Sequence, residues 1–151
     1  LFSAATQVGA IISNAPQSHI EALGKYGDAL GIAFQIVDDL LDVIGDSDKT
    51  GKNIGNDFRE KKLTLPFIKA ITAANAAERK FWERTIGKGE QKEGDLEKAL
   101  EFLKRHGAVE ATRKDAISWA QIAQNSLEFL PQNDIKDLLY NLSHYLTNRL
   151  N

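Results

Sequence analysis

The sequence has no cysteine and no methionine, and its 151 residues include only three prolines and three histidines. Without cysteine the chain forms no disulfide and no thiolate metal site, and we expect it in a reducing compartment, the cytoplasm. It also lacks an apolar run of membrane-spanning length and a signal peptide with a basic start, so we expect no stable membrane insertion. The scarcity of proline favours helices throughout.

Neither sign of charge dominates the chain. The formal net charge is -2, so there is no basic field of the kind that binds nucleic acid, and we expect no nucleic-acid partner. The content of 42% hydrophobic and 26% charged residues is ordinary for a globular protein with a core. Residues 1–8 already follow a helical pattern and no methionine begins the chain, which predicts a piece of a longer protein.

Hydrophobic periodicity predicts an all-α bundle. A first helix is expected over residues 1–12, and a second from Pro16, a residue tolerated in a first helical turn, to Gly45. A polar loop should follow, from Gly45 to Asp57. Five further helices are expected, with Gly107 as the cap that closes one of them. Their spans are Thr64 to Ala74, Ala76 to Ile86, Gly94 to His106, Ala108 to Leu130, and a last helix that begins at Asn133.

The second helix carries an acidic stripe. Gln35, Asp38, Asp39 and Asp42 follow the spacing i, i+3, i+4, i+7 and share one face of the helix. Every other residue of the segment 32–44 is apolar, which predicts a buried helix whose polar edge faces a cavity or cleft. Crowded carboxylates in such a place need a cation, and oxygen ligands without cysteine or histidine favour Mg²⁺. The alternative is an acidic, solvated helix face.

A glycine- and lysine-bearing loop follows the stripe. It contains the segments 51–57 and 60–66, in which Lys52 and Lys62 supply compact positive charges suited to a diphosphate. Lysines on a solvated surface are the ordinary alternative. A second alternative is calcium, because residues 46–51 match the first half of an EF-hand loop and Asp57 falls at its twelfth position. Asn53 and Ile54 do not suit that loop.

Together, the segments 31–42, 51–57 and 60–66 resemble the second aspartate-rich motif of the trans-polyprenyl diphosphate synthases and the loop that follows it. The pattern is most similar to the long-chain branch, the octaprenyl and decaprenyl diphosphate synthases. The resemblance implies an isoprenoid synthase-type helical bundle, of which residues 1–151 are the C-terminal portion of a single domain. The family's first aspartate-rich motif and its isopentenyl-binding arginines are absent, so this piece alone should be incomplete. Lys61 stands where many members have glycine.

The resemblance also implies an activity: a prenyltransferase that condenses an allylic prenyl diphosphate with isopentenyl diphosphate into a longer trans-polyprenyl diphosphate. The roles that it implies for individual residues are Mg²⁺ ligation by Asp38, Asp39 and Asp42, diphosphate binding by Lys52 and Lys62, and lining of the homoallylic side of the cleft by Phe34 and Gln35. The longer protein is expected to be a homodimer. Two other functions stay open, namely another class I terpenoid synthase and a non-catalytic helical or calcium-binding subunit.

Overall fold

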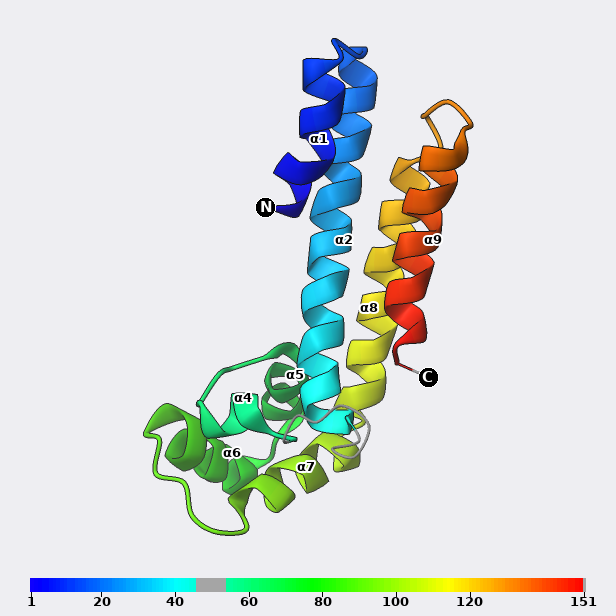
Figure 1. Ribbon diagram of the computed structural model, residues 1–151. Coiled ribbons are helices and arrows are strands. Elements are labelled where there is room, and N and C mark those ends of the chain that lie inside the picture. The colour runs from blue at the N-terminus through cyan, green and yellow to red at the C-terminus, as the bar shows by residue number, and fades with distance from the viewer. Residues whose placement is uncertain (46–53, 151) are drawn as a thin grey trace. The chain divides into compact units, whose positions relative to one another are not determined.

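Helices are the only regular elements in residues 1–45 and 54–150, the part of the chain that the computed structural model describes (Figure 1). The predicted all-α class is therefore confirmed. Lys52 and the segment 46–51 of the calcium alternative lie outside the described residues. No helix in the described ranges is long and apolar enough to cross a membrane. The elements are α1 (Phe2–Ile12), α2 (Gln17–Ile44), α4 (Asn56–Arg59), α5 (Leu65–Ala73), α6 (Ala76–Trp82), a π-helical turn (Glu83–Gly87), α7 (Asp95–Arg105), α8 (Ala108–Ser126) and α9 (Asp134–Asn148).

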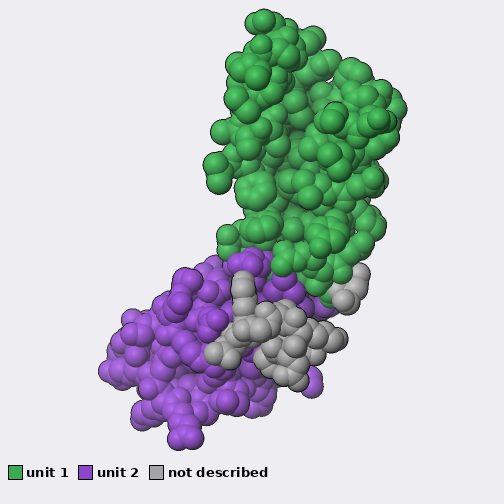
Figure 2. Space-filling model, viewed as in Figure 1, with its two compact units in different colours: residues 1–37, 114–151 green, residues 38–113 purple. Residues whose placement is uncertain are grey.

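The chain divides into two compact units (Figure 2). Unit 1 comprises Leu1–Val37 and Lys114–Asn151, and unit 2 comprises Asp38–Arg113. The acidic stripe of α2 is thereby shared, because Gln35 belongs to unit 1 and the three aspartates belong to unit 2. The two units are built differently.

Unit 1 is held by close backbone approach between α1 and α2. The Thr6 hydroxyl donates a hydrogen bond to the Leu23 carbonyl at 2.6 Å. A Cβ at Gly27 would lie 2.4 Å from the Thr6 Oγ1, so only glycine permits this spacing. On another side of α2, the fully buried Tyr26 donates its hydroxyl to the Leu139 carbonyl of α9 at 2.7 Å. Burial raises the pKa of Tyr26 to about 12.

Unit 2 is built on an aromatic cluster. Phe58 from α4 and Phe67 from α5 pack against each other and against Trp82, with ring centroids 5.8 to 6.5 Å apart. Phe81 and Phe102 extend the cluster toward α7. All five side chains are at most 6% exposed. Such rings bury a large apolar area, so this cluster is the core of unit 2.

Polar and charged groups connect the start of α6 to the end of α7 in unit 2. The Asn75 side chain accepts hydrogen bonds from the Ala77 and Glu78 N–H groups and completes a capping box with Glu78. The same Glu78 carboxylate contacts Arg105 at 2.8 Å and His106 at 2.8 Å, at the end of α7. Gly107, at φ 61°, then turns the chain into α8, as expected of a helix-ending glycine.

The prediction of a helix buried around most of its circumference was only partly right. Ala33, Ile36, Val37 and Leu40 are at most 6% exposed, so one face of α2 is in the core. Ile32 and Phe34 are each 39% exposed, which contradicts burial of the remaining apolar sector in this chain. Sequence periodicity could not separate these faces because the polar stripe is narrow and apolar residues occupy everything else.

Candidate active site

The acidic stripe lies on α2 as predicted, but its carboxylates have different surroundings. Asp38 is exposed, Asp42 is half-buried, and Asp39 is buried with an exposed fraction of 8%. Within the described residues, no group of three or more histidine or carboxylate side chains gathers as a metal site. The donors are all oxygens and suit Mg²⁺ chemically, but the three aspartates do not converge by themselves.

Asp42 is engaged with the protein backbone. Its Oδ1 accepts a hydrogen bond from the Asn56 N–H at 3.0 Å, and its Oδ2 accepts one from the Asp57 N–H at 3.1 Å. Burial raises the pKa of Asp42, and so does the nearby charge of Asp57. The two backbone hydrogen bonds and the charge of Arg59 act in the opposite direction without cancelling the rise.

Lys62 lies in an acidic environment of its own. Its Nζ contacts the Glu60 Oε2 at 2.6 Å and the Asp57 Oδ1 at 3.2 Å. Hydrogen bonds to Glu60 and Asp57 raise the pKa of Lys62, so the ammonium stays charged. The side chain is 57% exposed and so remains reachable by an anion from solvent.

Sequence reasoning gave Asp57 no role next to Lys62, and it missed α4 altogether. Asp57 joins the two predicted parts of the site, because its N–H reaches Asp42 while its carboxylate reaches Lys62. The only sequence signal was the short spacing between Asp57 and Lys62. A helix of four residues has no periodicity from which to predict it.

Phe34 faces an apolar pocket within unit 1. Its ring lies 5.4 Å from that of Phe2, and the two line a pocket of about 210 Å³ with Arg149 at the C-terminal end of α9. The other lining residues are Leu30, Leu142, Tyr145 and Leu146. Gln35 is exposed on the stripe.

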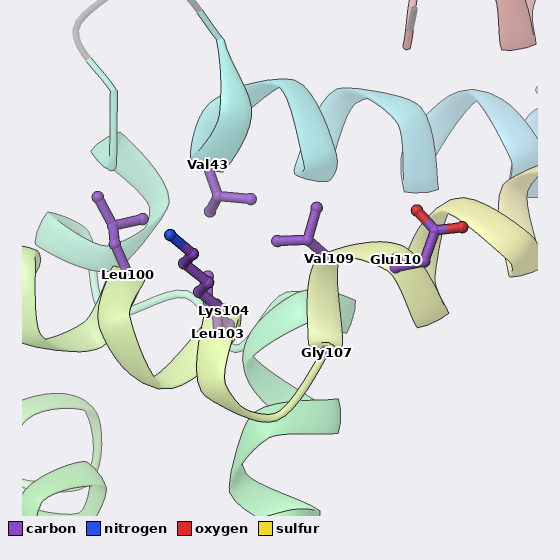
Figure 3. Close-up of a pocket in the computed structure, with 7 residues that line it drawn as sticks. All are labelled: Val43, Leu100, Leu103, Lys104, Gly107, Val109 and Glu110. Atoms are coloured by element: carbon purple, nitrogen blue, oxygen red, sulfur yellow. The ribbon is translucent and has the colours of Figure 1, made fainter.

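A separate pocket lies in unit 2. Val43, the residue after Asp42, is one of the residues that line it. It has a volume of about 370 Å³, and Figure 3 shows the Lys104 ammonium between Leu100 and Val43. Its other lining residues are Leu103, Gly107, Val109 and Glu110. No residue of the acidic stripe lines it, so this pocket is distinct from the predicted diphosphate site.

The described residues thus bring an acidic helix and the Lys62 segment together by hydrogen bonds in an all-helical arrangement. The chain matches the family model described as Polyprenyl synthetase over residues 1–103, and it belongs to that family. It is 35% identical to the short chain isoprenyl diphosphate synthase of Methanothermobacter thermautotrophicus, over 99% of this chain and 45% of that protein. It is 33% identical to the octaprenyl diphosphate synthase of Haemophilus influenzae, again over 99% of this chain and 45% of the relative.

Solved structures of polyprenyl synthases are also similar to this chain. A decaprenyl diphosphate synthase from Rhodobacter capsulatus superposes with a TM-score of 0.93 and 53% identity, over 99% of this chain and 46% of that one. A polyprenyl synthase from Caulobacter crescentus, complexed with calcium and isoprenyl diphosphate, gives a TM-score of 0.88 and 41% identity, over 97% of this chain and 44% of that one. The chain therefore spans about half the length of the proteins that it resembles.

Proposed function

We propose that this chain supplies the second aspartate-rich portion of a trans-prenyltransferase, which joins an allylic prenyl diphosphate to isopentenyl diphosphate. The observation that carries the proposal is the arrangement around α4: the acidic stripe is hydrogen-bonded to the segment that holds Lys62. Carboxylates and an ammonium group are thus available to one polyanionic ligand. The names of the relatives, all prenyl diphosphate synthases, support chain elongation, and no finding favours another class I terpenoid synthase or a non-catalytic subunit.

The difficult step in such a reaction is departure of the diphosphate, on which negative charge develops. We assign Asp38, the exposed carboxylate of the stripe, to hold Mg²⁺, which when bound would neutralise part of that charge. Lys62 places a permanent positive charge against the same leaving group. The carbon–oxygen bond breaks, the double bond of isopentenyl diphosphate attacks the carbocation, and a proton is then lost. Asp39, Lys52 and Gln35 stay predicted site residues.

Phe34 is assigned to the apolar part of the substrate. Its ring is partly exposed and lies beside Phe2 in an apolar pocket, where hydrocarbon would be stabilised by leaving water. The homodimer of the longer protein and the cytoplasmic location also stay predictions. Light scattering of the complete enzyme checks the first, and fractionation of cells that express it checks the second.

The test is elongation by a chimera in which residues 1–151 replace the matching part of the Rhodobacter capsulatus decaprenyl diphosphate synthase. With farnesyl diphosphate, isopentenyl diphosphate and Mg²⁺, we expect products longer than the primer, resolved by chromatography. Asp38→Ala should lower turnover by about 10² or more, because charge stabilisation is lost at the leaving group. Asp28→Ala removes another exposed aspartate of α2 and serves as the matched control, with activity retained. A folded but inactive chimera beside an active parent enzyme would contradict the proposal.

A further inference from the structure

The two oxygens of the Asp42 carboxylate lie at the N-terminus of α4. They accept the Asn56 and Asp57 N–H groups at 3.0 and 3.1 Å. These are the first two N–H groups of the helix, and such groups have no acceptor within their own helix. Asp42, which is 14 residues away from Asn56 in sequence, therefore supplies a cap that α4 cannot supply for itself.

Three further contacts hold α4 in place. The Gly55 N–H donates to the Asp42 carbonyl at 2.8 Å. Gly55 itself has φ 78°, and a Cβ there would come within 2.3 Å of the Leu96 side chain on α7, so the turn fits closely against its neighbour. On the other side, Phe58 is 1% exposed in the aromatic core. Contacts with Asp42 and Leu96 at its N-terminus and the burial of Phe58 in the core thus fix the position of α4.

Fixing α4 also fixes Lys62. The Lys62 N–H donates to the Asp57 carbonyl at 2.8 Å, and the Lys62 Nζ donates to the Asp57 carboxylate at 3.2 Å. A continuous series of hydrogen bonds therefore runs from Asp42 through Asp57 to both ends of Lys62. Asp38, one helical turn before Asp42, is exposed instead.

We infer that Asp42 is a positioning residue. Its carboxylate fixes the segment 55–62, and through it the Lys62 ammonium, rather than serving as a direct ligand of a metal ion. The aspartates of the acidic stripe then have different roles: Asp38 binds the cation, and Asp42 holds α4 in position. The effect on Lys62 and the diphosphate rests on the proposed function, whereas the capping of α4 does not.

Amide hydrogen exchange of this chain, measured residue by residue by NMR, tests the capping. In Asp42→Ala, the Asn56 and Asp57 amides should exchange about tenfold faster or more, because their hydrogen bonds to a charged group are lost. The Lys62 amide should also exchange faster, because its acceptor, the Asp57 carbonyl, is no longer held in place. In Asp42→Asn, one of the two helix amides should stay protected, since the side-chain amide offers one acceptor and not two. Asp28→Ala should change none of these rates.

Kinetics of the chimera test the positioning. Asp42→Ala should raise KM for the allylic diphosphate about tenfold and leave the Mg²⁺ concentration for half-maximal rate unchanged. Asp38→Ala should shift the Mg²⁺ requirement upward. If Asp42 acts through Lys62, adding Lys62→Ala to Asp42→Ala should cause little further loss, which is the non-additivity of residues that act together. Asp42→Asn should restore part of the KM.

Unchanged exchange at Asn56 and Asp57 in Asp42→Ala would overturn the inference. So would a Mg²⁺ shift as large as that of Asp38→Ala, which would make Asp42 a ligand. Faster exchange with an unchanged KM would also overturn it, because Asp42 would then stabilise α4 without positioning Lys62. If the unsubstituted chimera does not elongate, the proposed function fails, and the exchange rates still decide whether Asp42 caps α4.

Discussion

Unit 1 and unit 2 stabilise their helices by different means. Unit 2 encloses five aromatic rings and surrounds them with buried charged groups such as Glu78 and Asp95. Unit 1 relies on small residues and close backbone approach, and in the described residues it carries all of the exposed large apolar side chains except Leu63 and Ile68. Leu1 at 102% and Phe129 at 79% are the most exposed of them. Scattered exposed apolar residues are ordinary, but this concentration in one unit is not.

The difference shows where in the chain the positions of charged side chains are fixed. A site that must hold two charged groups at a set spacing needs rigid support, and unit 2 provides it through α4 and its aromatic anchor. Unit 1 instead presents many exposed apolar side chains, among them Phe34 beside its pocket.

The largest effect should come from the aromatic core. Phe58→Ala removes a ring that is 1% exposed and packs against Phe67 and Trp82, so we expect a loss of about 3–5 kcal/mol in the free energy of unfolding. Urea titration followed by circular dichroism measures it. Phe129→Ala, in unit 1, should stay within about 0.5 kcal/mol, because that ring is already in water. Equal losses at the two positions would abolish the contrast between the units.

Acid should weaken unit 2 first. Burial raises the pKa of Glu78, but hydrogen bonds from His106, the Asn75 N–H and Arg105 outweigh it and hold the pKa below its usual value. A hydrogen bond from Arg84 lowers the pKa of Asp95 in the same way, against burial. Groups with a lowered folded-state pKa stabilise above their unfolded pKa, and this stability is lost as pH falls through the folded value. We therefore expect the unfolding midpoint to decrease steadily below about pH 4.5.

The two tryptophans allow each unit to be followed alone, since Trp82 is in unit 2 and Trp119 is in unit 1. Trp119→Phe leaves Trp82 as the reporter, and its transition should be the acid-sensitive one. Glu78→Gln should reduce the dependence on pH. At the alkaline end the order reverses, because the pKa of Tyr26 in unit 1 is raised to about 12 and its stabilisation is lost as pH rises from 10 toward that value. Identical pH profiles for the two reporters would contradict this division.

The smallest effects should come from two backbone positions at the ends of α4, with opposite signs. Gly55→Ala places a Cβ at φ 78° and against Leu96, so we expect a loss of about 1–2 kcal/mol. Lys61 is a non-glycine residue at φ 60°, and Lys61→Gly should therefore stabilise by about 1 kcal/mol. Thermal unfolding of both variants measures the pair. If Lys61→Gly lowers the melting temperature, the contacts of the Lys61 side chain stabilise the protein by more than its left-handed backbone conformation destabilises it.

The sequence predicted every helix except α4, but it placed the ends of some of them wrongly. Leu65–Ala73, Asp95–Arg105 and the start of α9 at Asp134 agree with expectation within about a residue, because apolar periodicity and caps determine them. The helix expected to reach Ile86 instead ends at Trp82 and continues as a π-helical turn, and the one expected to reach Leu130 ends at Ser126. Apolar periodicity in the sequence does not predict where the hydrogen-bonding pattern changes at the end of a helix.

The candidate site shows the same limit. Periodicity placed Asp38, Asp39 and Asp42 on one stripe, which the structure confirms, and it treated them as equivalent. They are not equivalent, because the N–H groups that bind Asp42 come from a turn 14 and 15 residues further along the chain. Such a contact depends on how α4 is anchored by Phe58, and no spacing within α2 contains that information.

Gly31 packs closely against Phe2, a residue that lines the apolar pocket of unit 1. A Cβ at this position would lie 3.1 Å from the Phe2 ring, the same ring that packs beside Phe34. Because Gly31 has no Cβ, the Phe2 ring can pack close to α2. The position of this ring affects the width of the pocket that Phe2 and Phe34 line. A residue with no side chain, seven positions before the first aspartate, therefore helps to set the shape of this pocket.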